Sequence, residues 1–434
     1  SLFLVNRRER GDIGDRTKDE KWIFQPKITI HDQNEQSIFS SKGLNNIVEN
    51  EDPEIAEQDL LYRHAKVFAT GHGVSADWED SNEGEEKTSK IWTEFIPKRE
   101  IPSLIALESQ AQGTLLDMKE LSQLSSGGEI YEALIPMLNA YKEWIEKQKQ
   151  LSLDPQIQES VSLKDAANLN LELCEEVYKR MLRGLEHIRD NNNVAEAFKF
   201  SNEAMWRQRI QSILAQINSE NGTRTASFED NDIRKNRTWR PFQMGFFLIN
   251  ILGLSDPVDQ GLEERKMVDL LWFPTGGGKT EAYLGISAFV LGLRRLKGDQ
   301  DGYVSGAGTS IIMRYTLRLL TVQQFQRTTA LICACESIRR LDPQKWGQEP
   351  FQIGLWVGQN TTPNSFKNSR TALQELSEGR ILNQGSPVQI LSCPWCGKQL
   401  SDSRGRPLSG SYGIDNDRAR TIISCLNPDC EFCR

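Results

Sequence analysis

The spacing of apolar residues changes along the chain and divides it into regions. From residue 115 to 217, apolar residues recur every three or four positions, which predicts helices. After a further apolar helix at 239–254, short apolar runs follow at 268–273, 309–315 and 352–357, with helical patterns between them. Runs of this length are typical of buried strands. Strands that alternate with helices favour a parallel sheet with right-handed crossovers.

This pattern predicts an α/β protein with four regions. Residues 1–114 contain two strand-like stretches and form an amino-terminal β-containing domain, and residues 115–237 form a helical region that ends in a polar linker. The helical region is most simply a domain that packs its own core, and a partner-binding insert is the alternative. Residues 238–390 form the lobe that carries the predicted parallel sheet. Residues 391–434 form a cysteine-containing segment.

The stretch after the strand at 268–273 predicts a nucleotide site. A strand, a glycine-rich turn, a Lys–Thr pair and an amphipathic helix follow one another, which is the layout of a phosphate-binding loop. Glycines let backbone N–H groups surround an anion, and the helix N-terminus adds its positive dipole end. A glycine-rich turn without a ligand is the alternative, and the complete order of elements argues against it. The predicted site for ATP and Mg²⁺ comprises Thr275, Gly276, Gly277, Gly278, Lys279, Thr280 and Glu281.

Two residues of this site are the candidate catalytic residues. Lys279 can reach the β- and γ-phosphates of ATP, and the Thr280 hydroxyl can ligate Mg²⁺. Upstream, Gln243 ends the sequence RPFQ, and its amide can hydrogen-bond an adenine edge in both directions. We therefore add Gln243 to the nucleotide site, where it would favour ATP over GTP. A surface residue on a core helix is the alternative for Gln243.

Polar residues at the ends of two predicted strands form a candidate DNA-binding site. In parallel sheets, ligands bind at the carboxyl ends of the strands. Hydroxyls, amides and backbone N–H groups gather there after 309–313 and 352–357, and such groups suit the backbone of a DNA strand. The candidate DNA-binding residues are Arg314, Tyr315, Thr316, Arg318, Gly358, Gln359 and Thr361.

The cysteines are concentrated near the end of the chain, where they predict a metal site. Five of the eight cysteines lie between residues 393 and 433, and two of them form the sequence CPWCG. Two cysteine pairs about 30 residues apart are typical of a tetrahedral Zn²⁺ site. We favour Cys393, Cys396, Cys425 and Cys430 as ligands. Cys433 is the alternate for one of the last two.

Composition and charge add little that is specific. The chain has 434 residues and a formal net charge of −8. This charge argues against a protein that binds nucleic acid over most of its surface, but not against a local basic channel. It has no apolar run of membrane-spanning length and no signal-peptide pattern at its start, so we expect a cytoplasmic protein without a membrane partner.

Several of these stretches together resemble a known family. The sequences YRHAKVFATGHG, WRPFQMGF, FPTGGGKTEAYLG, RYTLRLLTVQQFQR, GLWVGQNTTPN and CPWCG are similar to those of the DrmA family, the helicase-like subunits of the DISARM anti-phage system of bacteria. The resemblance implies a superfamily 2 DNA helicase or translocase with a RecA-like first lobe at 238–390 and a zinc-ribbon-like insertion at 391–434. It also implies a DrmB-like protein partner, and DNA that is single-stranded or has a single-stranded end as the target.

One departure from the pattern of superfamily 2 motors affects the expected activity. These motors need an Asp–Glu pair after an apolar strand downstream of the phosphate loop, and residues 281–434 contain no such pair. The second motor lobe is absent too. We therefore expect the chain to be the amino-terminal portion of an ATP-driven translocase. The alternative is a nucleotide-gated scaffold that binds DNA and recruits partners without unwinding.

Overall fold

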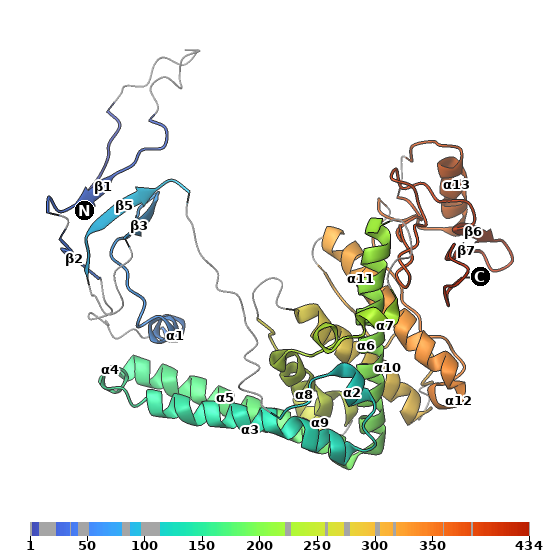
Figure 1. Cartoon of the computed structure of the whole chain (residues 1–434), viewed down its shortest axis with the longest axis horizontal. Helices are drawn as coiled ribbons and strands as arrows, with labels where there is room; N and C mark the ends of the chain where they lie inside the picture. The colour runs from blue at the N-terminus through green and yellow to red at the C-terminus, as the bar shows by residue number, and fades with distance from the viewer. Residues whose placement is uncertain are drawn as a thin grey trace. The chain divides into compact units, whose positions relative to one another are not determined.

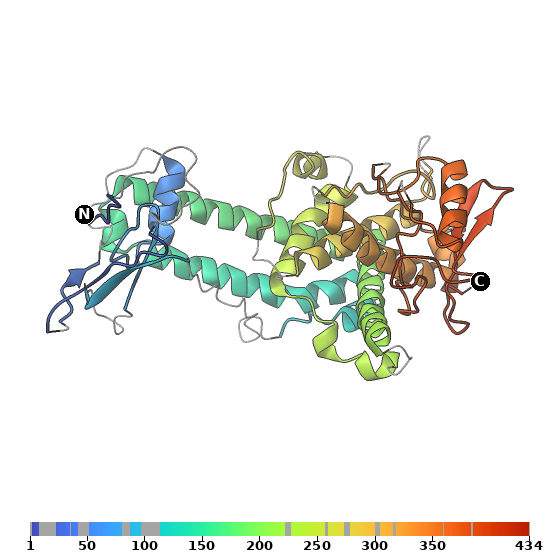
Figure 2. The same cartoon turned by 90° about the horizontal axis from the view of Figure 1, so that it is seen from above.

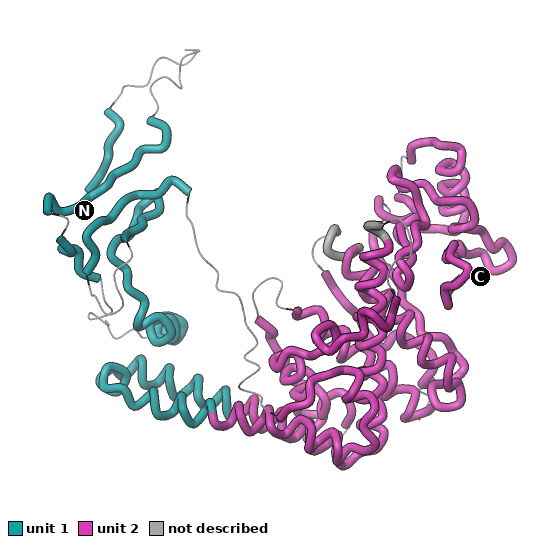
Figure 3. Tube along the Cα trace, in the orientation of Figure 1, with its two compact units in different colours: residues 1–103, 144–175 teal, residues 104–143, 176–434 magenta. Residues whose placement is uncertain are grey.

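The chain forms two compact units, and the boundary between them falls inside two long helices. Figures 1 and 2 show the elements from two directions, and Figure 3 distinguishes the units. Unit 1 comprises Ser1–Ser103 and Trp144–Glu175, and unit 2 comprises Leu104–Glu143 and Glu176–Arg434. The computed structural model describes residues 2–7, 23–34, 36–41, 52–79, 87–96, 113–221, 227–256, 259–272, 278–299, 304–315, 318–358, 360–382 and 385–433.

The described residues of the 1–103 part of unit 1 form two small antiparallel sheets and one short helix. Strands β1 (Thr29–His31), β5 (Lys90–Glu94) and β3 (Ser75–Trp78) pair in the order β1-β5-β3. Ile91 of the central strand β5 lies opposite Ile30 of β1 and opposite Trp78 of β3. Strands β2 (Phe39–Ser40) and β4 (Lys87–Thr88) form the second sheet. These strands confirm the β-structure that the sequence predicts for this part of the chain.

Helix α1 (Pro53–Leu61) packs inside unit 1 against the turn and the start of the second long helix of a helical hairpin. Asp52 caps it through a side-chain bond to the Glu54 N–H at 3.0 Å. The hairpin consists of α3 (Gly127–Leu151), α4 (Pro155–Gln158) and α5 (Val161–Asp190). The small apolar core of this contact comprises Ala56, Leu60, Ile157, Leu163, Ala166 and Ala167.

Unit 2 is built around α6 (Asn192–Asn221), which is buried on several sides. Phe198, Phe200 and Met205 are buried, and α10 (Lys279–Lys297) and α11 (Arg318–Leu341) both contact this helix. The Ser201 hydroxyl donates to the Gly285 carbonyl of α10 at 2.7 Å. Polar residues of this helix, among them Ser201 and Asn202, are buried together with its apolar ones.

The other elements of unit 2 surround this core or follow it. The hairpin of β6 and β7 lies beside α13, where Ser369 and Thr421 share a hydrogen bond of 2.7 Å (Figure 2). Among the described residues, no helix combines the length and the apolar character that crossing a membrane requires. The remaining elements of unit 2 are α2 (Met118–Ser122), α7 (Phe228–Asn231), η4 (Arg234–Asn236), α8 (Pro241–Ser255), α9 (Asp259–Glu264), α12 (Pro343–Trp346), α13 (Phe366–Ser377), β6 (Tyr412–Asp415) and β7 (Arg420–Ile423).

The three predicted strands of the lobe form no ladder within the described part of the chain. Residues 267–272, 310–315 and 352–357 have irregular backbone, yet the exposure of their side chains largely alternates between neighbours. Alternation is the pattern of a strand that is covered on one face. Val268 and Trp356 are 96% and 99% exposed. The parallel sheet therefore stays a prediction, and the structure shows one covered face and one open face along these segments.

Candidate nucleotide and metal sites

The predicted nucleotide site lies where α10 begins. Gly278 caps this helix with φ 88° and ψ 27°, a left-handed conformation that favours glycine. Lys279 and Thr280 form the first turn of the helix and are half-buried. Thr275, Gly276 and Gly277 lie outside the described residues. The described half of the site therefore presents a Lys–Thr pair at the N-terminus of a helix of 19 residues, where the helix dipole favours an anion.

Gln243 is buried and contacts the same glycine. It lies in the first turn of α8 and is 4% exposed, so it is no surface residue. Its Oε1 accepts from the Arg240 N–H at 2.8 Å, and its Nε2 donates to the Gly278 carbonyl at 2.7 Å. A Cβ atom at Gly278 would lie 2.6 Å from Nε2, so a larger residue there would have to displace the Gln243 amide. The Gln243 amide thus connects the start of α8 to the start of α10.

An ion pair joins the first turn of α10 to α11. Arg327 of α11 donates to Glu281, the acidic residue that follows the Lys–Thr pair. Arg327 is a site residue that the sequence did not reveal, because it lies 46 positions from Glu281 and no local pattern relates the two. The pair places α11, which continues the candidate DNA-binding segment, in direct contact with the candidate nucleotide site.

The candidate DNA-binding residues have different environments. Arg314 and Gly358 are exposed, and Tyr315 is half-buried. Thr361 is only 6% exposed, and its backbone N–H donates to the Gly358 carbonyl at 2.8 Å. Thr316 and Gln359 lie outside the described residues, as does the side chain of Arg318, the first residue of α11. Of the predicted set, the described residues that are exposed to a ligand are Arg314 and the backbone of Gly358.

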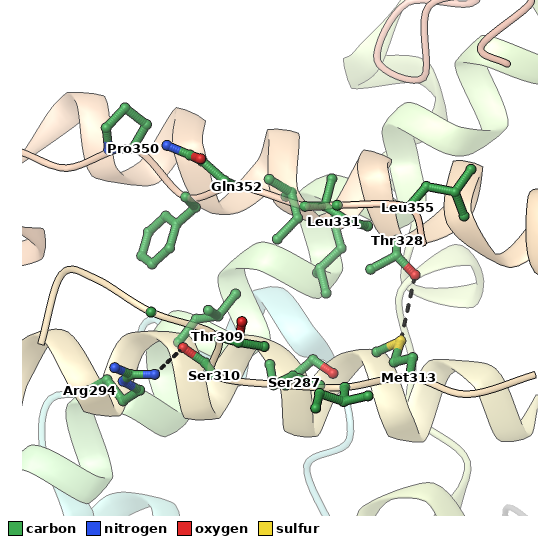
Figure 4. Close-up of a pocket in the computed structure, with 18 of the residues that line it drawn as sticks. Ser287, Arg294, Thr309, Ser310, Met313, Thr328, Leu331, Pro350, Gln352 and Leu355 are labelled. Atoms are coloured by element: carbon green, nitrogen blue, oxygen red, sulfur yellow. Dashed lines mark hydrogen bonds between the residues drawn. The ribbon is translucent and has the colours of Figure 1, made fainter. Parts of the chain in front are cut away.

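A cavity of about 960 Å³ separates the two segments that precede these residues. Figure 4 shows Thr309, Ser310 and Met313 on one side and Pro350, Gln352 and Leu355 on the other. Arg294 donates to the Ser310 hydroxyl at 2.5 Å, and the Thr328 hydroxyl lies 3.8 Å from the Met313 sulfur. The two segments therefore flank an open slot over α10 and α11 and do not pair with each other.

Four of the cysteines converge as the sequence predicts. The sulfur atoms of Cys393, Cys396, Cys425 and Cys430 all lie within 4.8 Å of one another. The Sγ atoms of Cys396 and Cys425 are 3.4 Å apart, and those of Cys393 and Cys430 are 4.0 Å apart. Cys433 is not in this group, although its N–H donates to the Cys430 carbonyl at 2.9 Å.

This geometry fits a tetrahedral metal ion. Zn–S bonds of about 2.3 Å imply sulfur–sulfur distances of about 3.8 Å in a tetrahedron. The Gly397 N–H donates to the Cys393 carbonyl at 2.9 Å, which closes the tight turn between the first two cysteines. These four side chains could hold Zn²⁺.

The cysteine cluster packs directly on two helices of unit 2. Asn218 of α6 donates to the Cys396 carbonyl at 3.2 Å, and Arg340 of α11 donates to the Glu431 carbonyl at 3.1 Å. Gly397 approaches the backbone of Ala215 so closely that a Cβ atom would lie 2.4 Å from the Ala215 carbonyl oxygen. The cysteine cluster is therefore part of the same core as α6 and α11.

Comparison of the sequence with known proteins gives a named relative. The chain is 33% identical over 444 residues to the DISARM protein DrmA of Bacillus paralicheniformis. The alignment covers the whole of this chain and 37% of that protein, so the chain spans little more than a third of the relative's length. No family model matches the sequence.

Proposed function

Because this chain belongs to the DrmA family of DISARM proteins over the part that it spans, we propose that it is the amino-terminal portion of an ATP-driven DNA translocase in anti-phage defence. One observation carries the proposal. A buried glutamine of α8 binds the carbonyl of Gly278, and Lys279 and Thr280 follow at the N-terminus of α10. This arrangement supports a nucleoside triphosphate site in which Lys279 contacts the phosphates and Thr280 binds Mg²⁺.

The residues of this chain would bind and position ATP. The helix dipole and the Lys279 ammonium favour the phosphates. We propose that Gln243, whose amide bonds the Gly278 carbonyl, also contacts adenine. Lys279→Ala tests this part of the proposal, and its expected effect is argued in the Discussion. Hydrolysis by a superfamily 2 motor also needs an Asp–Glu pair, which residues 281–434 do not contain. A DrmB-like subunit is the proposed protein partner, and co-purification of the full-length proteins tests it.

We also propose that the lobe is RecA-like. The alternating exposure of 310–315 and 352–357 and the slot between them suit parallel strands that pair with a further strand. In the full-length protein, we expect backbone amides of these two segments to exchange with solvent at least tenfold more slowly than in the chain of 434 residues. Hydrogen exchange read by mass spectrometry measures this. Equal exchange in both proteins would contradict a completed sheet, and residues 234–236 of η4 serve as the internal control.

DNA binding should depend on two arginines, one at the start of α11 and one four residues before it. If Arg314 and Arg318 contact the DNA backbone, replacing both with alanine should weaken all sequences about equally, because phosphate contacts carry no sequence information. The slope of log K against the logarithm of the salt concentration, measured for single-stranded DNA, should become shallower by about 1.4. This is roughly 0.7 for each lost phosphate contact. Fluorescence anisotropy across a range of salt concentrations measures both effects.

The matched control removes the same charge elsewhere. Arg234 and Lys235 are exposed residues of η4, and their double alanine variant should leave the salt slope unchanged. An equal loss in both variants would show that net charge, and not this site, sets the affinity. ATP binding should survive in both variants, and its loss in the Arg314/Arg318 variant would place these residues in the nucleotide site instead.

A further inference from the structure

An aspartate in the segment before the phosphate loop lies in an unusual position. Asp269 interrupts the apolar run of residues 267–273, four residues before that run ends. Its neighbours Val268 and Leu270 are 96% and 88% exposed, so apolar packing does not fix this part of the chain. An acidic side chain within an apolar run needs a compensating partner when it is partly buried. The Asp269 carboxylate points toward the helices and is the group through which this segment is held.

The partner is Arg180 of α5. The Arg180 side chain is 7% exposed, and it meets the Asp269 carboxylate with two parallel bonds of 2.6 Å and 2.9 Å. A bidentate pair of this kind fixes orientation as well as distance. A third nitrogen, Nε, donates to the Glu264 carboxylate at 2.7 Å. The guanidinium group is therefore held between two carboxylates.

Two further contacts make this arrangement rigid. Arg180 Nη2 also lies 3.4 Å from the Ile249 carbonyl of α8, the helix that carries Gln243. The other oxygen of Glu264 accepts from Arg183 at 2.7 Å. Arg183 contacts Glu264 and Glu176 but makes no bond to Asp269. Only Arg180, among these two arginines, connects the helices to the segment before the loop.

We propose that Arg180 is a positioning residue for the nucleotide site: the Arg180–Asp269 pair fixes residues 267–272, and the Gln243–Gly278 bond fixes the start of α10. The upstream pair is ionic and bidentate, and the downstream contact is a single bond of 2.7 Å to a carbonyl. Both holding side chains come from helices of unit 2 that contact each other through the Ile249 carbonyl. Arg180 thereby fixes residues 267–272 relative to α8, the helix whose Gln243 bonds the start of α10.

This inference rests on the proposed nucleotide site, and a small displacement of the loop should be costly there. Groups that bind a phosphate act through geometry, and misplacement by about 1 Å can reduce function on the order of 100-fold. Arg180→Lys keeps the positive charge but removes the two-nitrogen fork. Asp269→Asn keeps the shape but removes the negative charge. Both variants should raise the dissociation constant for ATP by about tenfold or more.

The test compares these variants with Arg183→Lys in the full-length protein. That control retains the charge, alters the same Glu264 network and leaves the Arg180–Asp269 pair intact. ATP affinity is measured with a fluorescent ATP analogue well below the melting temperature of each variant. Arg183→Lys should change affinity less than threefold. Equal weakening in Arg180→Lys and Arg183→Lys would overturn the proposal, because both would then act only on the stability of the network.

A second readout does not depend on ATP. Hydrogen exchange of residues 267–272 should accelerate in Arg180→Lys and Asp269→Asn but not in Arg183→Lys. If the wild-type protein binds no ATP while this exchange pattern appears, the proposed function fails and the positioning of the segment stands. If exchange in 267–272 is the same in all variants, Arg180 does not position the segment and the inference is overturned.

Discussion

Lys279→Ala should reduce ATP hydrolysis by the full-length protein by at least about 100-fold, the scale on which removal of one preorganised donor acts on a developing charge. The reason is the position of the residue. Lys279 is the first residue of α10, directly after the glycine that Gln243 holds. An ammonium group there stabilises the phosphate that is transferred, and alanine offers no replacement. The measurement is steady-state release of phosphate, with and without single-stranded DNA.

The control is Lys266→Ala. Lys266 is an exposed lysine that pairs with Glu263 and lies outside the candidate site, so its removal should leave turnover unchanged. Unchanged turnover in Lys279→Ala would contradict the assignment of the nucleotide site. If Lys279→Ala abolishes turnover and the wild-type protein moves along DNA, the translocase is supported. Nucleotide-dependent DNA binding without movement would support a scaffold instead.

The helices and the cysteine cluster could be predicted because their signals are local. Apolar spacing predicts α8, α10 and α11 close to their observed bounds, since each helix buries one face along its length. The pairs around Cys393 and Cys425 predict the four-sulfur cluster, because only a few spacings let thiols share one metal ion. In both cases the determining residues are near neighbours in the sequence or repeat a short motif.

The contacts that organise the nucleotide site could not be predicted in the same way. Glu281 and Arg327 lie 46 positions apart, and Arg180 and Asp269 lie 89 positions apart. Such pairs are set by how helices cross, and the sequence contains no pattern that relates them. Asp269 did carry a usable signal, because an acid inside an apolar run requires a partner. The sequence indicates that need but not which arginine meets it.

The predicted strands of the lobe show the opposite case, in which a local pattern does not establish pairing. Residues 267–272 and 352–357 have the alternating exposure of strands, and Trp356 is 99% exposed. Ladder formation requires a neighbouring backbone at about 4.8 Å, and the cavity of about 960 Å³ lies where one neighbour would be. Local preference therefore shapes these segments, while pairing depends on chain that is distant in sequence.

Zinc should be the largest single contribution to the stability of the carboxy-terminal part of this chain. The purified protein should contain about one Zn²⁺ per chain, and Cys393→Ser should lose it, because a structural site needs all four thiolates. Zinc binding contributes about 10–16 kcal/mol in small zinc-binding peptides at pH 7, so its loss should unfold the cluster locally. The effect should also reach α6 and α11, which contact the cluster through Asn218 and Arg340.

The experiment combines metal analysis with hydrogen exchange. Cys433→Ser is the matched control, because Cys433 lies beside the cluster but outside the group of four sulfur atoms. It should retain zinc and wild-type exchange, whereas Cys393→Ser should lose zinc and exchange faster at 393–400, at 425–430 and at the ends of α6 and α11. Absence of zinc from protein purified without chelators would refute the metal site. Loss of zinc in Cys433→Ser with retention in Cys430→Ser would mean that the fourth ligand is Cys433, and that the arrangement of sulfur atoms changes when the metal binds.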